Sequence, residues 1–226
     1  MMTTTTLRPE TTAAGEVVVA ATRHLFEAGV LSHAGHANLS ARLDADRFVL
    51  TTTGVVRDLR SDQVAALDLA GTVLDGELSA ENAEIIAMHA AVYQARPAVG
   101  GIIHTHSPAA TAFALANKEL PCRVEPLLRF GQAEPVPVVA WGPRGSDVSV
   151  RGIVDVLAER PTTSALLLAN HGLLAFGADP VSTARLVVAI EEAAEAELRA
   201  VLLGGAVDFP SGALDQVRAS MARVRS

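Results

Sequence analysis

Two short apolar runs, each leading to a histidine, constrain the fold of this chain more than any other feature. Residues 99–104 read VGGIIH, and residues 164–170 read SALLLAN with His171 directly after them. Runs of this length and character are typical of short strands buried in the middle of a sheet. The sequence therefore predicts a core sheet in which two strands end close to polar, chemically versatile side chains.

Helical patterns alternate with these and other short strand-like segments along the chain. Helices are expected at residues 10–28, 79–94, 146–159 and 181–203, with a further one beginning at Ser107-Pro108. Strands or hairpins are expected after the turn at 32–37, over 47–53, and over 64–74. Residues 120–145 are rich in Pro and Gly and are expected to run over the surface. This alternation favours a layered α/β domain.

No linker or repeat divides the chain, so we expect a single domain over residues 10–226 behind a disordered tail over residues 1–9. The net charge of −7 and the single lysine argue against a nucleic-acid partner, which would need clustered Lys and Arg. The charged fraction of 19% is low, which favours self-association.

One cysteine, Cys122, excludes an intrachain disulfide and fits a reducing compartment. The N-terminal residues are polar and do not form a secretory signal, and no apolar stretch reaches the roughly 18 residues that span a bilayer. We therefore expect a cytoplasmic protein without a membrane partner.

His104 and His106 form a His-Thr-His motif at the end of the first apolar run. Side chains two apart on a strand point to the same side, so both imidazoles can reach one cation. If the strand before His171 lies nearby, a third imidazole completes a site that suits zinc or a similar divalent metal. The alternatives are a hydrogen-bonded histidine pair in a polar pocket, and a turn histidine at position 171.

Four segments together resemble the class II aldolase/adducin family, whose members include fuculose-phosphate aldolase and related decarboxylases. They read NLSAR, LTTTG, MHAAVYQARPAVGGIIHTHSPAATAFA and LLLANHGLLAFG, in the family's order and spacing. The resemblance implies a three-layer α/β/α domain with a mainly antiparallel central sheet, and a homotetramer with active sites at subunit interfaces. It also assigns Zn²⁺, Mn²⁺ or Co²⁺ to His104, His106 and His171.

The resemblance further implies a reaction in which the metal stabilises an enediolate while a carboxylate moves a proton. The family places that acid four residues before the equivalent of His89, where this chain has Ile85. Glu84 and Glu81 are the candidate replacements, with Glu84 preferred. The alternative is that both merely favour the start of the helix through its dipole.

The substrate-binding positions are also carried over from the family. Asn38, Thr53 and Gly54 match positions that bind a substrate phosphate in the sugar-phosphate aldolases, and Ser40 lies in the same NLSAR motif. The paired serines that complete that phosphate site are missing, so a carboxylate is the alternative ligand, with Arg129 or Arg123 as its partner. His36 precedes NLSAR in a turn that lines the substrate pocket in relatives.

The family's aldolases use tyrosines as proton donors, whereas this chain has only Tyr93. The sequence thus predicts a metal-dependent carbon–carbon lyase for a small hydroxy-carbonyl or hydroxy-acid substrate, either an aldolase or a decarboxylase, with a role in carbohydrate metabolism. A ketose-phosphate epimerase or dehydratase is the second hypothesis. A non-catalytic adducin-like module is the third, and the complete histidine triad disfavours it.

Overall fold

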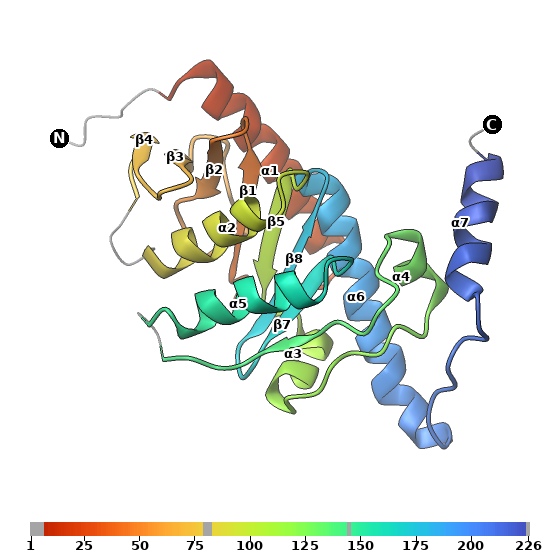
Figure 1. Cartoon of the computed structure of the whole chain (residues 1–226). Helices are drawn as coiled ribbons and strands as arrows, with labels where there is room; N and C mark the ends of the chain where they lie inside the picture. The colour runs from red at the N-terminus through yellow and green to blue at the C-terminus, as the bar shows by residue number, and fades with distance from the viewer. Residues whose placement is uncertain (1–6, 79–82, 144–145, 225–226) are drawn as a thin grey trace.

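A computed structural model describes residues 7–78, 83–143 and 146–224, and within them the chain forms a three-layer α/β/α domain (Figure 1). The described strands form one eight-stranded sheet in the order β4-β3-β2-β1-β5-β8-β7-β6. Every neighbouring pair is antiparallel except β6 and β7, which are parallel. The strands are β1 (Ala37–Arg42), β2 (Arg47–Thr51), β3 (Val64–Asp68), β4 (Val73–Asp75), β5 (Gly101–Thr105), β6 (Val138–Val139), β7 (Ala165–Leu168) and β8 (Gly172–Gly177).

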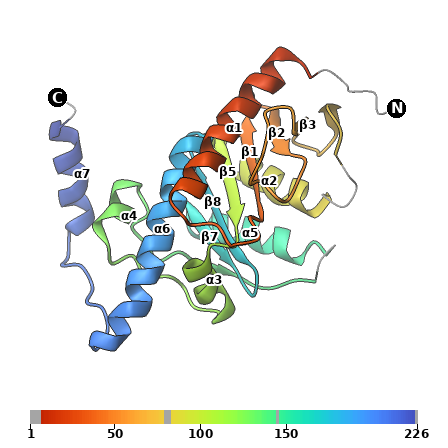
Figure 2. The ribbon, with the colours of Figure 1, turned by 180° about the vertical axis from the view of Figure 1, so that it is seen from behind.

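Helices cover both faces of the sheet, as Figures 1 and 2 show from opposite sides. Helices α2 and α5 pack together over one face, and α1, α6 and α3 cover the other. Short α4 lies beside α6 and contacts α7. The helices are α1 (Pro9–Glu27), α2 (Ala83–Ala95), α3 (Pro108–Leu115), α4 (Glu125–Arg129), α5 (Val148–Glu159), α6 (Pro180–Ala200) and α7 (Ala213–Val224), with a 3-10 turn at Val201–Leu203.

Two apolar cores, one on each face, follow from the alternation of side chains along the strands. Ile103 and Leu173 point toward α1 and α6, whereas Ile102 and Leu174 point toward α2 and α5. Because these strands are apolar on both faces, the sheet is buried between two helical layers. The layered arrangement and the mainly antiparallel sheet confirm the predicted fold class.

The segment over residues 120–145 differs from the irregular surface stretch that we expected. It contains α4 and the edge strand β6, and Leu120, Leu127 and Val136 are fully buried. Strand β6 has only two residues and pairs with β7 across a long stretch of chain. Local periodicity does not reveal so short a strand, because its pairing depends on a distant partner.

The ends of the chain add two observations. Residues 1–6 of the expected tail lie outside the described residues, and α1 begins at Pro9, with Arg8 donating its backbone N–H to the Asp75 carboxylate. Helix α7, which the sequence patterns did not predict, follows an extended stretch after α6 (Figure 1). No helix among the described residues combines the length and apolar character needed to cross a membrane.

Candidate metal centre and surrounding cavity

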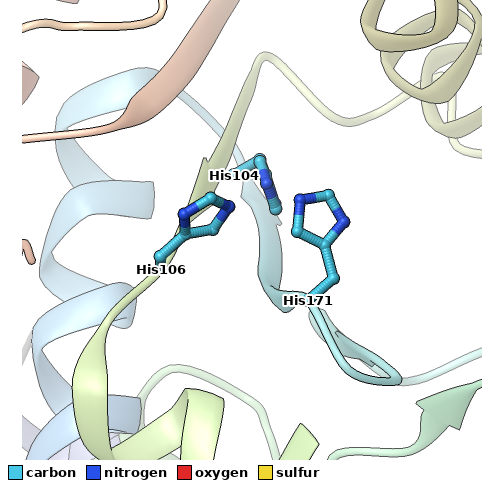
Figure 3. Close-up of side chains that lie close together, drawn as sticks. All are labelled: His104, His106 and His171. Carbon is cyan, nitrogen blue, oxygen red and sulfur yellow. The ribbon is translucent and has the colours of Figure 1, made fainter. Parts of the chain in front are cut away.

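His104, His106 and His171 point toward one another from two different parts of the sheet (Figure 3). Their ring centroids lie 5.1 Å (His104–His106), 4.6 Å (His104–His171) and 5.0 Å (His106–His171) apart. One ligand nitrogen from each ring can be chosen so that all three lie within 4.8 Å of one another. Three imidazoles in this arrangement can hold one divalent cation and leave a coordination position open.

The topology brings the three histidines together because β5 and β8 are antiparallel neighbours. The end of β5 therefore lies beside the start of β8, with Thr105 opposite Leu173. We expected the strand before His171 to be the possible neighbour of the His-Thr-His strand, but β8 stands between β5 and β7. His171 reaches the site from the tight turn between β7 and β8, where Asn170 adopts a left-handed conformation with φ of 57°.

A hydrogen bond determines which nitrogen of His104 faces the cluster. Its Nδ1 lies 2.9 Å from the backbone carbonyl oxygen of Leu173, and because a carbonyl only accepts, Nδ1 carries the proton. The lone pair of His104 is therefore on Nε2, which is the atom that can bind a cation. A histidine ligand whose other nitrogen donates to a backbone carbonyl is the usual arrangement in metal sites.

Burial keeps the two His-Thr-His imidazoles neutral. It lowers the pKa of His104 well below its ordinary value, and the nearby imidazoles of His171 and His106 lower that pKa further, against the opposing hydrogen bond to Leu173. Burial also lowers the pKa of His106, with His171 and His36 adding to the effect. A neutral imidazole offers its lone pair to a cation, so the local environment favours metal binding over proton binding.

The three histidines line a cavity of about 340 Å³ between the sheet, α2, α5 and the segment that follows β6. Its wall combines polar side chains with apolar ones from both helices. The lining includes His36, Asn38, Gly54, Glu84, Met88 and Trp141, in addition to the three histidines. A volume of this size fits a small molecule rather than a macromolecule.

The described residues include only one of the two candidate acids, Glu84. Glu84 lies in the first turn of α2 and lines the cavity. Glu81 lies outside the described residues. Ile85 also lines the cavity, so the first turn of α2 forms part of the cavity wall.

Three of the predicted substrate-binding residues lie at the cavity. Asn38 of β1 is directly opposite His104 of β5 in the sheet, and it is 7% exposed. Gly54 and His36 lie at the rim, where His36 Nδ1 is 3.3 Å from the Gly54 carbonyl oxygen. These residues and the histidines form one continuous surface.

The other three predicted substrate-binding residues, Ser40, Thr53 and Arg129, do not line this cavity. Ser40 is fully buried behind Asn38, and the Thr53 hydroxyl bonds the backbone of Val55. Arg129 pairs with Glu125 on α4 and lines a separate groove between α4 and α7. Arg123, the alternative clamp, bonds Glu197 and Asp208 instead.

His89 is a core residue held by two side chains. Its Nε2 lies 2.6 Å from Asn38 Oδ1, and its Nδ1 lies 2.6 Å from Ser40 Oγ. Ser40 Oγ in turn lies 2.9 Å from the hydroxyl of Tyr93. Full burial lowers the pKa of His89 to about 3, so this imidazole stays neutral.

Sequence reasoning missed the far wall of the cavity. Trp141, Ser149 and Ile153 line it from the loop after β6 and from α5. The one signal for this wall was a lone tryptophan within a segment rich in Pro and Gly, because a large exposed aromatic in a loop often marks a binding surface. Trp141 is 59% exposed and is the chain's only tryptophan.

Comparisons with known proteins find matches that cover most of this chain. The family model described as Class II Aldolase and Adducin N-terminal domain matches residues 16–198. A 3-oxo-tetronate 4-phosphate decarboxylase of Haemophilus influenzae is 31% identical over 189 residues, covering 80% of this chain and 84% of that protein. A methylthioribulose-1-phosphate dehydratase of Pseudomonas aeruginosa is 32% identical over 197 residues, covering 82% and 94%. Among solved structures, an L-fuculose 1-phosphate aldolase superposes with a TM-score of 0.79 at 23% identity, covering 93% of this chain and 96% of the other.

Proposed function

The chain belongs to the class II aldolase and adducin family, as its motifs predicted, and from this premise we propose that it is a metal-dependent carbon–carbon lyase. Its substrate is a small hydroxy-carbonyl or hydroxy-acid compound. The similarity to a decarboxylase and to an aldolase supports this class of reaction, because both enzymes cleave a C–C bond.

The observation that carries the proposal is the position of three imidazoles on the wall of a cavity of small-molecule size. The donor set fits a zinc ion or another borderline divalent metal, because neutral imidazole nitrogens suit such ions. The tautomer of His104 fits as well, since its Nε2 lone pair is left for a ligand bond. A cation held there would act as a Lewis acid that stabilises negative charge developing on a substrate oxygen.

The chain's own residues would then bind the substrate and move its protons. Glu84 lines the same cavity and is the preferred proton donor and acceptor, with Glu81 as the alternative. Asn38 and the Gly54 backbone present polar groups beside the histidines and would hold a substrate oxygen. Met88 and Ile153 form an apolar wall that limits water around the reacting carbon.

Tyr93 favours decarboxylation over aldol cleavage. It is the chain's single tyrosine, is 1% exposed, and bonds Ser40 away from the cavity. In the aldolases that this chain resembles, a tyrosine exchanges the proton of the hydroxyl that becomes the aldehyde oxygen, whereas a carboxylate loses CO2 without that step. A buried phenol cannot serve this role in its own subunit or in a neighbouring one.

We also propose that the protein works in the cytoplasm as a homotetramer with active sites at subunit interfaces. The low charged fraction and the strongly exposed apolar side chains of Val201, Leu202 and Leu203 at the end of α6 support self-association. A dehydratase or epimerase of the same family is the second candidate, favoured by the 32% identity to the Pseudomonas dehydratase.

Two measurements test the proposed function. Metal analysis of the purified protein should find close to one divalent ion per chain, and His104→Ala should lose most of it. His33→Ala is the matched control, because His33 is exposed and does not line the cavity. Retention of stoichiometric metal by His104→Ala would refute the ligand assignment.

The reaction is assigned by supplying 3-oxo-tetronate 4-phosphate, L-fuculose phosphate and methylthioribulose-1-phosphate, and measuring CO2, aldehyde and dehydrated product. CO2 release that is lost in His104→Ala supports the decarboxylase. Aldehyde release assigns the aldolase, and loss of water without C–C cleavage would overturn the carbon–carbon lyase proposal in favour of the dehydratase.

A further inference from the structure

A buried chain of hydrogen bonds leads from the core of the domain to the cavity wall. Tyr93, Ser40, His89 and Asn38 are joined in this order by contacts of 2.9, 2.6 and 2.6 Å. Each of the four residues is at most 7% exposed. Only Asn38 lines the cavity, where it lies opposite His104 in the sheet.

The sequence spacing explains why these four side chains meet. Asn38 and Ser40 are two apart on β1, so both point to the same face of the sheet. His89 and Tyr93 are four apart on α2, so they lie on the same face of that helix. Where α2 packs on β1, the two pairs interlock.

Tyr93 determines which group donates and which accepts in each of these hydrogen bonds. Among the described residues, the hydrogen-bond partner of the Tyr93 hydroxyl is Ser40 Oγ. If Ser40 donated to Tyr93, the phenol proton would be buried where the described residues offer it no acceptor, which is unfavourable. Burial also raises the pKa of Tyr93, so its proton is retained and available for donation.

The donor and acceptor of the other two hydrogen bonds follow from the one at Tyr93. Tyr93 donates to Ser40, so the Ser40 proton is free to be donated to His89 Nδ1. His89 then carries its proton on Nε2 and donates it to Asn38, whose only acceptor is Oδ1. The amide nitrogen of Asn38 is the group left on the cavity side.

We infer that Tyr93, Ser40 and His89 are positioning residues, which orient the Asn38 amide so that its N–H groups point into the cavity beside His104. The inference rests on the proposed function and deepens it. It specifies that the substrate presents an oxygen acceptor at Asn38, next to the oxygen that the histidine site would bind. A hydroxy acid or a hydroxy ketone offers two adjacent oxygens of this kind.

The deciding measurement is the tautomer of His89 in the zinc-loaded protein, read from long-range ¹H–¹⁵N correlation spectra. The wild type should carry the proton on Nε2. Tyr93→Phe removes the hydroxyl that donates to Ser40, so Ser40 can accept from His89 instead. The Nδ1–H form of His89 should then become populated. Thr22→Val is the matched control, because it removes a buried hydroxyl from α1 and should leave the His89 tautomer unchanged. A wild-type proton on Nδ1 would overturn the inference.

Glycolate, the smallest hydroxy acid, tests the orientation of Asn38, and the emission of Trp141 reports when it occupies the cavity. Bound glycolate should shift the side-chain N–H signals of Asn38, and Tyr93→Phe should bind it about threefold to tenfold more weakly. Unshifted Asn38 signals under occupancy would contradict a donor role. Because neither readout needs turnover, an inactive protein with the expected tautomer would refute the proposed function and leave this inference standing.

Discussion

Gly172 lies so close to Thr105 that a Cβ atom on the glycine would stand 2.4 Å from the Thr105 carbonyl oxygen. The same atom would lie 3.0 Å from the His106 ring and 3.4 Å from the His104 ring. The close approach occurs where the end of β5 meets the start of β8, which is the contact that unites the three histidines. The glycine after His171 is therefore packed tightly against two histidines of the candidate metal centre.

Substituting Gly172 by alanine should separate β5 from β8 locally. We expect Gly172→Ala to lower the free energy of unfolding by about 1–3 kcal/mol, as overpacking does in a tight core. Zinc affinity should also fall, because His104 and His106 are displaced. Denaturant titration and zinc titration measure the two effects. Gly54→Ala is the control, since a Cβ there meets nothing within 4 Å, and normal zinc affinity in Gly172→Ala would contradict the prediction.

Glu84→Gln should separate metal binding from proton transfer. Because Glu84 lines the cavity from α2 but is not part of the histidine cluster, the variant should keep its metal. Its kcat should fall by about 10²–10⁴-fold if Glu84 moves the proton. Steady-state kinetics with Glu81→Gln in parallel decide which acid acts. Glu159→Gln, on the exposed end of α5, should be unaffected.

His89 should make the metal-free protein less stable in acid. Its pKa is about 3 in the folded protein and about 6.5 when unperturbed, so the unfolded chain binds the extra proton first. The stabilising contribution is complete above pH 6.5 and declines as the pH falls toward 3, by about 1.4 kcal/mol per pH unit. Between pH 7 and 5 the wild type should therefore lose about 2 kcal/mol more than His89→Gln. Urea titrations at both pH values measure this, and equal losses would argue against a buried neutral His89.

Asp179 should stabilise the start of α6. Its side chain accepts from the Ser182 backbone N–H, while the Ser182 hydroxyl accepts from the Asp179 backbone N–H, which makes a reciprocal capping box. Asp179→Ala should reduce the free energy of unfolding by about 1 kcal/mol without changing zinc content. Thermal unfolding followed by circular dichroism, with Asp147→Ala as a control lacking a capping hydrogen bond, checks the effect.

The sequence by itself determined the layered α/β class, most helix and strand positions, and the identity of the three metal-ligand candidates. These features are encoded locally: apolar runs mark buried strands, helical spacing marks the amphipathic helices, and His-Thr-His places two rings on one side of a strand. The motifs around these histidines also predicted the family to which the chain belongs.

Only the tertiary structure decided which strands are neighbours and therefore which side chains share the cavity. It placed β8 between β5 and β7, brought Trp141 and α5 to the site, and directed Arg129 to a separate groove. It also revealed the bonds that join His89 to Asn38, Ser40 and, through Ser40, Tyr93. The reason is physical: strand order and helix packing are set by contacts between residues far apart in the chain, and no local pattern records them.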